Sequence, residues 1–143
     1  MAQVTLRGNP IATSGELPAV GSEAPDFTLT TSDLGSVSLG DLRGQRVVLN
    51  IFPSIDTPVC ASSVRTFNER AADLDNTRVL SVSADLPFAH ARFCGTEGIE
   101  NATGSSTFRS DFADTYGVRM TDGPLAELCA RAVVVIGDDG TVA

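Results

Sequence analysis

Residues 47–60 read VVLNIFPSIDTPVC. The first six residues form a short, apolar and largely β-branched run, which is typical of a strand buried in a sheet. Thr57 is a favourable helix N-cap and Pro58 a favourable first helical residue, so a helix is expected to begin soon after the strand. Cys60 is then the third helical residue, close to unpaired backbone N–H groups and to the positive end of the helix dipole. The segment therefore predicts a strand–helix unit with a thiol at the start of its helix.

Cys60 has two interpretations. A free cysteine is most often a small, buried apolar residue. A helix N-terminus and a nearby cation, however, favour the thiolate form of a cysteine, which is its nucleophilic form. Because the cap, the proline and the strand end converge on one sulfur, we interpret Cys60 as a reactive cysteine.

The composition excludes several classes of protein. The chain has 143 residues, of which 42% are hydrophobic and 20% charged, as expected for one soluble globular domain. No apolar run is long enough to cross a membrane, and the first residues do not resemble a signal peptide, so a cytoplasmic location is expected. The net charge of −8 disfavours binding to nucleic acids and to anionic membranes. All ten basic residues are arginine, which excludes the chemistry of a Schiff-base or P-loop lysine.

The cysteine pattern suggests redox chemistry rather than metal binding. The three cysteines are Cys60, Cys94 and Cys129, and none forms a C-x-x-C pair. The one histidine, His90, cannot complete a zinc site with that spacing, and no G-x-G-x-x-G motif is present, so neither a metal nor a cofactor is expected. What remains is a catalytic or redox pair and a third cysteine. We expect Cys129 to be a packing residue and His90 to have no chemical role.

The rest of the chain predicts alternating strands and helices. A turn cluster at residues 8–10 predicts an N-terminal hairpin, and one helical turn is expected at residues 39–44. Further strands are expected at residues 27–30, 37–39, 78–83 and 132–136, and helices at residues 58–74, 85–94 and 108–116. This order predicts an α/β fold with a central mixed β-sheet flanked by helices. Phe52, Phe88 and Phe93 are expected in the core, where they would also line an apolar mouth of the site.

Three motifs resemble those of the peroxiredoxin family. Pro53, Thr57 and Cys60 match its P-x-x-x-T-x-x-C signature. Residues 85–95, DLPFAHARFCG, resemble a second signature of the thiol peroxidase (Tpx) subgroup, and residues 130–136, ARAVVVI, resemble the strand that carries its active-site arginine. The three motifs occur in the order found in that subgroup, and the N-terminal hairpin also fits.

The resemblance implies a thioredoxin-like fold and an antioxidant enzyme that reduces hydrogen peroxide and organic hydroperoxides. In this atypical 2-Cys pattern, Cys60 is similar to the peroxidatic cysteine and Cys94 to the resolving cysteine, and the two form a Cys60–Cys94 disulfide within one subunit. Pro53, Thr57 and Arg131 match the residues that complete the peroxide site. Such enzymes are typically homodimers that thioredoxin reduces.

The domain is expected to span residues 1–143. The chain ends shortly after a tight turn at residues 137–140, where a partner strand is expected. The closing strand and C-terminal helix of the family have no counterpart in the sequence, so we interpret it as one peroxiredoxin domain that lacks these elements.

Two other functions fit part of the pattern. Residues 60–63, CASS, match the C-x-x-S motif of a monothiol thiol–disulfide oxidoreductase. A redox sensor that passes oxidation to a partner protein would use the same thiolate. Thr57, three residues before Cys60, and the second cysteine at position 94 favour the peroxidase. Since both cysteines are expected on helices, we also expect local unwinding before they form a disulfide.

Overall fold

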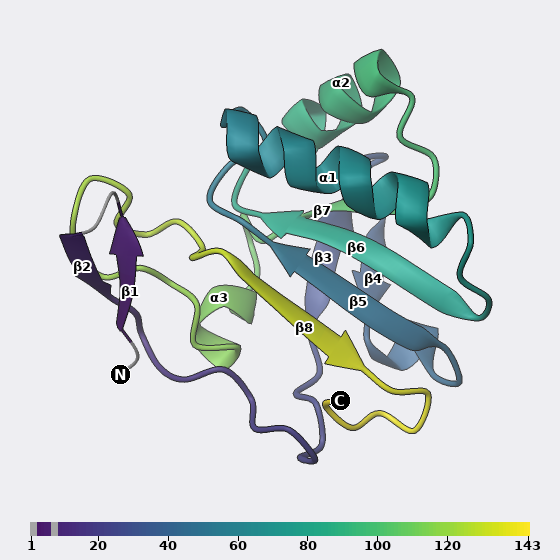
Figure 1. Ribbon diagram of the computed structural model, residues 1–143, viewed down its shortest axis with the longest axis horizontal. Coiled ribbons are helices and arrows are strands. Elements are labelled where there is room, and N and C mark those ends of the chain that lie inside the picture. The colour runs from purple at the N-terminus through teal and green to yellow at the C-terminus, as the bar shows by residue number, and fades with distance from the viewer. Residues whose placement is uncertain (1–2, 7–8) are drawn as a thin grey trace.

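A six-stranded mixed sheet forms the centre of the computed structural model, which describes residues 3–6 and 9–143 (Figure 1). Its order is β4-β3-β7-β6-β5-β8. The strands are β3 (Thr28–Thr31), β4 (Ser36–Ser38), β5 (Arg46–Ile51), β6 (Thr77–Ser83), β7 (Ala102–Ser106) and β8 (Ala132–Ile136). Strands β5, β6 and β7 are parallel, whereas the other neighbours are antiparallel. The predicted mixed central sheet is confirmed.

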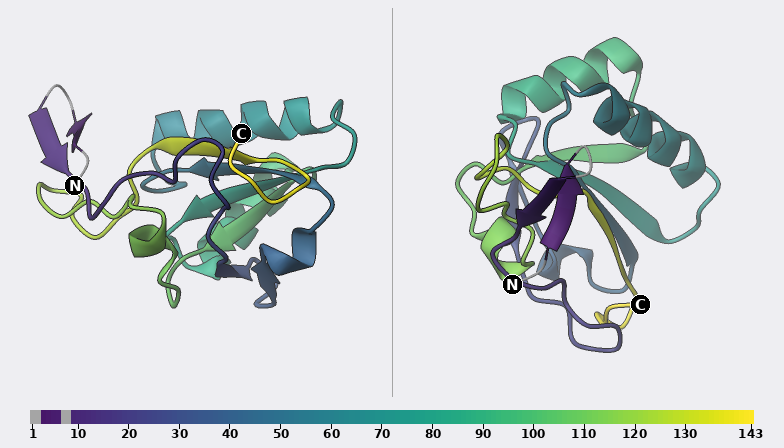
Figure 2. Two further views of the ribbon diagram at one scale, coloured as in Figure 1. Left: turned by 90° about the horizontal axis from the view of Figure 1, so that it is seen from below. Right: turned by 60° about the vertical axis from the view of Figure 1, so that its left-hand side comes forward.

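Helices cover both faces of this sheet. Helices α1 (Pro58–Ala71) and α2 (Pro87–Glu97) lie side by side on one face, and the short α3 (Phe112–Thr115) lies on the other (Figures 1 and 2). A single 3-10 turn, η1 (Gly40–Leu42), precedes β5. The core is accordingly divided in two: Val47, Leu49 and Ile51 of β5 pack on the α3 side, and Val48 packs on the side of α1 and α2. Because β5 is covered on both faces, its sequence is nearly continuously apolar.

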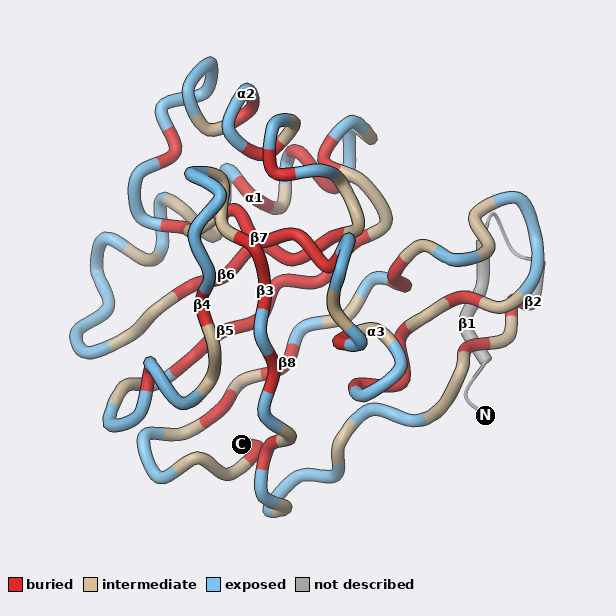
Figure 3. The backbone as a smooth tube through the Cα atoms, turned by 180° about the vertical axis from the view of Figure 1, so that it is seen from behind, coloured by how far each residue is buried: buried red, intermediate tan, exposed pale blue. Residues whose placement is uncertain are grey.

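The buried residues follow the central strands, and the exposed residues lie mainly in the loops and on the outer faces of the helices (Figure 3). Within residues 3–6 and 9–143, no helix has both the length and the apolar character that a membrane span requires.

The N-terminal hairpin forms a small sheet of its own. Strand β1 (Gln3–Leu6) pairs with β2 (Asn9–Ala12) in antiparallel fashion. Asn9 and Pro10, which were expected in the turn, belong to β2, and Gly8 of the predicted turn cluster lies outside the described residues. The hairpin is joined to the rest of the molecule where Thr13 pairs with Met120.

Two predictions about secondary structure need correction. Strand β7 is missing from the sequence-based prediction because its residues, ATGSS, are small and show no apolar alternation, although most of them are buried. The helix expected at residues 108–116 is wrong for half of its length, since α3 has four residues and a turn precedes it, closed by the Ser110 N–H donating to the Thr107 carbonyl.

Helix α1 begins where the sequence predicts, whereas α2 begins at Pro87, two residues after its predicted start, and both helices end elsewhere than predicted. Helix α1 ends at Ala71 rather than at residue 74, and α2 extends to Glu97, three residues beyond its predicted end. Gly98 then ends α2 in the left-handed conformation, with φ of 67°. One core prediction on α2 is wrong: Phe88 is 67% exposed because it lies on the outer side of the helix, whereas Phe93 is buried.

The C-terminal residues return towards the end of β8. The predicted turn at residues 137–140 is closed by the Gly137 N–H, which donates to the Thr141 carbonyl. Val142 then pairs with Ile136, and Thr141 pairs with Glu23.

Candidate active site

Cys60 lies at the start of α1, at the carboxyl end of β5. Thr57 occupies the N-cap position with an extended backbone and Pro58 the first helical position, so Cys60 is the third residue of the helix, as predicted. The residue is only 1% exposed and belongs to the apolar cluster beneath α1 and α2, together with Phe52 and Val64. The sulfur is thus held in an apolar environment at the positive end of a helix.

Arg131 reaches Cys60 from the neighbouring strand. Strand β8 pairs with β5 so that Ala132 lies opposite Ile51, which brings the residue before β8 to the carboxyl end of β5. The Arg131 Nη2 donates a hydrogen bond to Cys60 Sγ at 3.0 Å. A permanently charged guanidinium at this distance favours a negative charge on the sulfur.

Thr57 and Pro53 lie in the loop between β5 and α1. The Thr57 hydroxyl donates to the carbonyl oxygen of Ser54 at 3.0 Å and caps no helical N–H. The cap position predicted for Thr57 is therefore confirmed, whereas the side-chain cap is wrong. Pro53 is half-buried and directly follows Phe52, which is fully buried.

Cys94 lies in the last turn of α2. It is half-buried and packs against the apolar cluster that contains Cys60, and both residues are free thiols. Burial raises the pKa of the Cys94 thiol, and a backbone hydrogen bond from Gly104 partly opposes that rise. Cys94 is therefore held mainly as a neutral thiol.

His90 and Cys129 are both buried. The His90 ring is 1% exposed, and burial lowers its pKa. Its Nε2 lies 3.0 Å from Ser83 Oγ. Cys129 is fully buried, which raises its pKa to about 12 and confirms that it is a packing residue. Within the described part of the chain, no group of three histidine, cysteine or acidic residues is arranged to hold a metal ion.

Sequence reasoning missed Asp85, which follows the end of β6. Its carboxylate accepts hydrogen bonds from Ser54 and from the backbone N–H of Ile55, both in the loop before α1. Asp85 opens the family-like segment of residues 85–95, but an acidic residue between a strand end and a helix start is equally typical of a helix-capping residue, so the sequence does not indicate its contact with the loop before α1.

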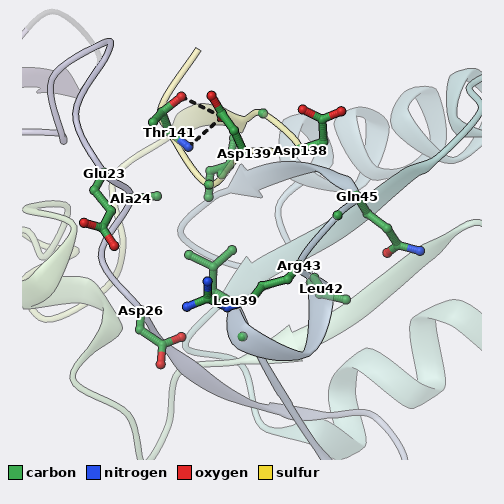
Figure 4. A pocket seen from close by; sticks show the side chains of 15 residues that line it. Glu23, Ala24, Asp26, Leu39, Leu42, Arg43, Gln45, Asp138, Asp139 and Thr141 are labelled. Atoms are coloured by element: carbon green, nitrogen blue, oxygen red, sulfur yellow. Dashed lines mark hydrogen bonds between the residues drawn. The ribbon is translucent and has the colours of Figure 1, made fainter.

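A hollow at the opposite end of β5 contains none of these residues. It is lined by the segment around Glu23 and Asp26, by η1, and by the turn around Asp139 (Figure 4). The Asp139 carboxylate is already paired with the N–H and the hydroxyl of Thr141. The hollow is therefore separate from Cys60 and Arg131, which lie at the carboxyl end of β5.

The fold and this site define a class of protein: a thioredoxin-like sheet with a cysteine at the start of the helix that follows a central strand, next to an arginine. Comparison with known proteins agrees. Residues 19–143 match the redoxin family. The chain is 65% identical to a thiol peroxidase of Mycobacterium tuberculosis and 54% identical to one of Corynebacterium glutamicum, in both cases over all of its length and 86% or 87% of theirs.

A crystal structure of a peroxiredoxin-like protein from Aquifex aeolicus superimposes with a TM-score of 0.94 at 39% identity, covering all of this chain and 84% of the other. The chain belongs to the redoxin family and is a peroxiredoxin enzyme of the thiol peroxidase subgroup. The peroxiredoxin resemblance and the thioredoxin-like fold are confirmed. The catalytic roles expected for Cys60, Cys94, Thr57, Arg131 and Pro53 stay predictions.

Proposed function

We propose that this enzyme reduces hydrogen peroxide and organic hydroperoxides with Cys60 as the peroxidatic cysteine. The observation that carries the proposal is the Arg131 hydrogen bond to the Cys60 sulfur, 3.0 Å long, at the start of α1. The thiolate attacks one peroxide oxygen, the O–O bond breaks, and the other oxygen leaves as an alkoxide or hydroxide that takes up a proton. Cys60 becomes a sulfenic acid.

The remaining residues of the site act on the same step. Arg131 stabilises the negative charge first on the sulfur and then on the departing oxygen. The Thr57 hydroxyl, now bonded to the Ser54 carbonyl, is a donor that can turn to a bound peroxide. Pro53 shapes the loop beside the sulfur and shields it from water.

Cys94 serves as the resolving cysteine in this proposal. Its thiol attacks the sulfenic acid of Cys60, so a disulfide forms and water leaves. A disulfide requires Cβ atoms about 3.5–4.5 Å apart, and each cysteine now lies within a helix, so the first turn of α1 and the last turn of α2 unwind. Thioredoxin then reduces the disulfide by thiol–disulfide exchange and is itself oxidised.

We also propose that the enzyme works as a homodimer in the cytoplasm as part of antioxidant defence. Exposed apolar side chains at the starts of the two main helices, Val59, Leu86 and Phe88, support an association surface. Free thiols are typical of proteins from a reducing compartment.

One equivalent of hydroperoxide added to the reduced protein, followed by mass spectrometry, tests the cysteine roles. The expected product is a Cys60–Cys94 bridge within one chain, with Cys129 still free. Cys60→Ser abolishes peroxide consumption, and Cys94→Ser allows one turnover followed by over-oxidation. Cys129→Ala is the matched control and keeps full turnover. A bridge to Cys129 would contradict the assignment of Cys94.

The near-complete burial of Cys60 argues against a general thiol–disulfide oxidoreductase, because a protein disulfide is too bulky to reach the sulfur in the folded site. Reduction of insulin disulfides faster than consumption of cumene hydroperoxide would reverse this choice. Repeated turnover with thioredoxin and its reductase would separate an enzyme from a redox sensor.

A further inference from the structure

One carboxylate joins the two segments that carry Cys60 and Cys94. Asp85 lies in the turn between β6 and α2. Its Oδ1 accepts a hydrogen bond from Ser54 Oγ at 2.8 Å, and its Oδ2 accepts one from the Ile55 N–H at 2.7 Å. Ser54 and Ile55 both belong to the loop that leads into α1, so the charge-assisted bonds fix that loop to the start of α2.

A buried hydrogen-bond chain extends this connection into α2. Ser83 Oγ donates its proton to Asp85 Oδ2 at 2.5 Å, so the Ser83 oxygen accepts from His90 Nε2 at 3.0 Å. His90 packs against β7 so closely that a Cβ built on Gly104 would lie 2.8 Å from the His90 Cβ. The hydrogen-bond chain therefore runs from the loop before Cys60 through Asp85 and Ser83 to His90 in the first turn of α2.

This serine, histidine and aspartate are not a nucleophilic triad. The aspartate bonds to the serine rather than to the histidine, and Ser83 is fully buried. A hydrolytic triad needs the reverse order and an accessible serine. The network has a positioning role.

We propose that Asp85 is a positioning residue that holds the loop before α1 closed and so sets how long oxidised Cys60 stays in its folded site. This inference rests on the proposed function. While Asp85 holds Ser54 and Ile55, the loop that leads into the first turn of α1 stays fixed to the start of α2. An ion pair between Arg92 and Asp56 spans the same two segments, but its side chains are 60% and 64% exposed, so it contributes little.

The length of time for which the loop before α1 stays closed decides which of two reactions the Cys60 sulfenic acid undergoes. After opening, the Cys94 thiol displaces its hydroxyl, which gives the disulfide and water. In the closed site, a second hydroperoxide transfers one oxygen to the sulfenic acid, which gives a sulfinic acid and an alcohol, or water if the oxidant is hydrogen peroxide. By keeping the site closed, Asp85 favours the second fate at high peroxide concentration.

Asp85→Asn tests this role because it keeps the shape of the side chain, removes its charge and turns one of its acceptors into a donor. We expect the peroxide concentration that converts half of Cys60 to sulfinic acid to rise by about tenfold. In the reduced protein, we expect the Ile55 amide to exchange its hydrogen about tenfold faster. Asp114→Asn is the matched control, since Asp114 accepts a hydrogen bond from Arg119 outside this network, and neither quantity should change.

The outcomes separate the inference from the proposed function. The role of Asp85 would be overturned by a folded Asp85→Asn variant that leaves two quantities unchanged: the peroxide concentration that converts half of Cys60 to sulfinic acid, and the hydrogen-exchange rate of the Ile55 amide. If Asp85→Asn does not fold, Ser54→Ala removes one of the same bonds and should move both quantities in the same direction; no movement overturns the inference. A wild-type protein that forms no Cys60–Cys94 bridge contradicts the proposed function, and the Ile55 exchange then still decides whether Asp85 holds the loop.

Discussion

Helices α1 and α2 begin alike and hold their cysteines differently. Each has proline at its first position, after an extended residue whose side chain makes no capping hydrogen bond. Cys60 lies at the positive end of α1, and Cys94 lies at the negative end of α2. Cys60 is the more deeply buried of the two, yet its sulfur accepts a hydrogen bond from Arg131. Burial of Cys94, by contrast, raises its pKa.

The comparison teaches that depth of burial alone does not describe the environment of a thiol. The two sulfurs differ in the helix end at which they lie and in whether a guanidinium donates to them. The following variants test this difference, from the largest expected effect to the smallest.

Arg131→Gln should remove most of the excess reactivity of Cys60 over Cys94 towards hydrogen peroxide. Because one preorganised charge-stabilising donor is lost, the second-order rate constant for reaction with hydrogen peroxide should fall by about 100-fold. Stopped-flow measurement on the reduced protein checks this value. Arg65→Gln is the control, because Arg65 lies on the same helix and pairs with Glu97 at the surface. Equal rate constants in wild type and Arg131→Gln would show that Arg131 is not what distinguishes Cys60 from Cys94.

Gly104→Ala should disturb α2 and leave α1 in place. The added Cβ would lie 2.8 Å from the His90 Cβ, so the free energy of unfolding should fall by about 1–3 kcal/mol. Gly95→Ala is the matched control within α2: its Cβ meets no atom within 4 Å, and a better helix former should raise the free energy of unfolding by about 0.5–1 kcal/mol. Urea unfolding measures both changes. If both substitutions changed the free energy of unfolding in the same direction, the close packing of α2 against Gly104 would not be what limits that position.

His90 should make the packing of α2 sensitive to acid. Burial lowers the pKa of His90 in the folded protein, against an opposing effect of Asp85. Below its ordinary pKa of about 6.5, the unfolded chain therefore binds a proton that the folded protein does not, and stability falls as the pH falls. Melting temperatures at about pH 7.5 and pH 5.5 should differ more in wild type than in His90→Gln. An equal difference in both proteins would contradict this.

The sequence predicted the central unit of the fold because its signals are local. An apolar run of six residues, a Thr-Pro start and a three-to-four-residue spacing identify β5 and α1 within a few residues. Strand β7 has none of these signals. Its small residues are buried because other elements pack on them, and not because they are hydrophobic. Phe88 shows the converse, because an aromatic residue at a helix start predicts a core position, whereas the Phe88 side chain is exposed.

The site was predictable only in part for the same reason. The position of Cys60 follows from its own helix, whereas Arg131 was found through a family motif and reaches the sulfur only because β8 pairs with β5. Asp85 lies 30 residues from Ile55 along the chain, and no local pattern reveals that their atoms meet. Hydrogen bonds between distant segments depend on the order of the strands in the sheet, and the hydrophobic periodicity of one segment gives no information about that order.

The burial of Cys60 gives the folded site a filter based on molecular size. Because Cys60 is 1% exposed and its sulfur is hydrogen-bonded to Arg131, a small peroxide displaces far fewer neighbouring atoms on its way to the sulfur than glutathione disulfide or a protein thiol would. In the proposed cycle, the same cysteine becomes open to large partners once the first turn of α1 unwinds. Such a site would react with oxidants in a cell crowded with thiols and exchange electrons with another protein only after an oxidant has arrived.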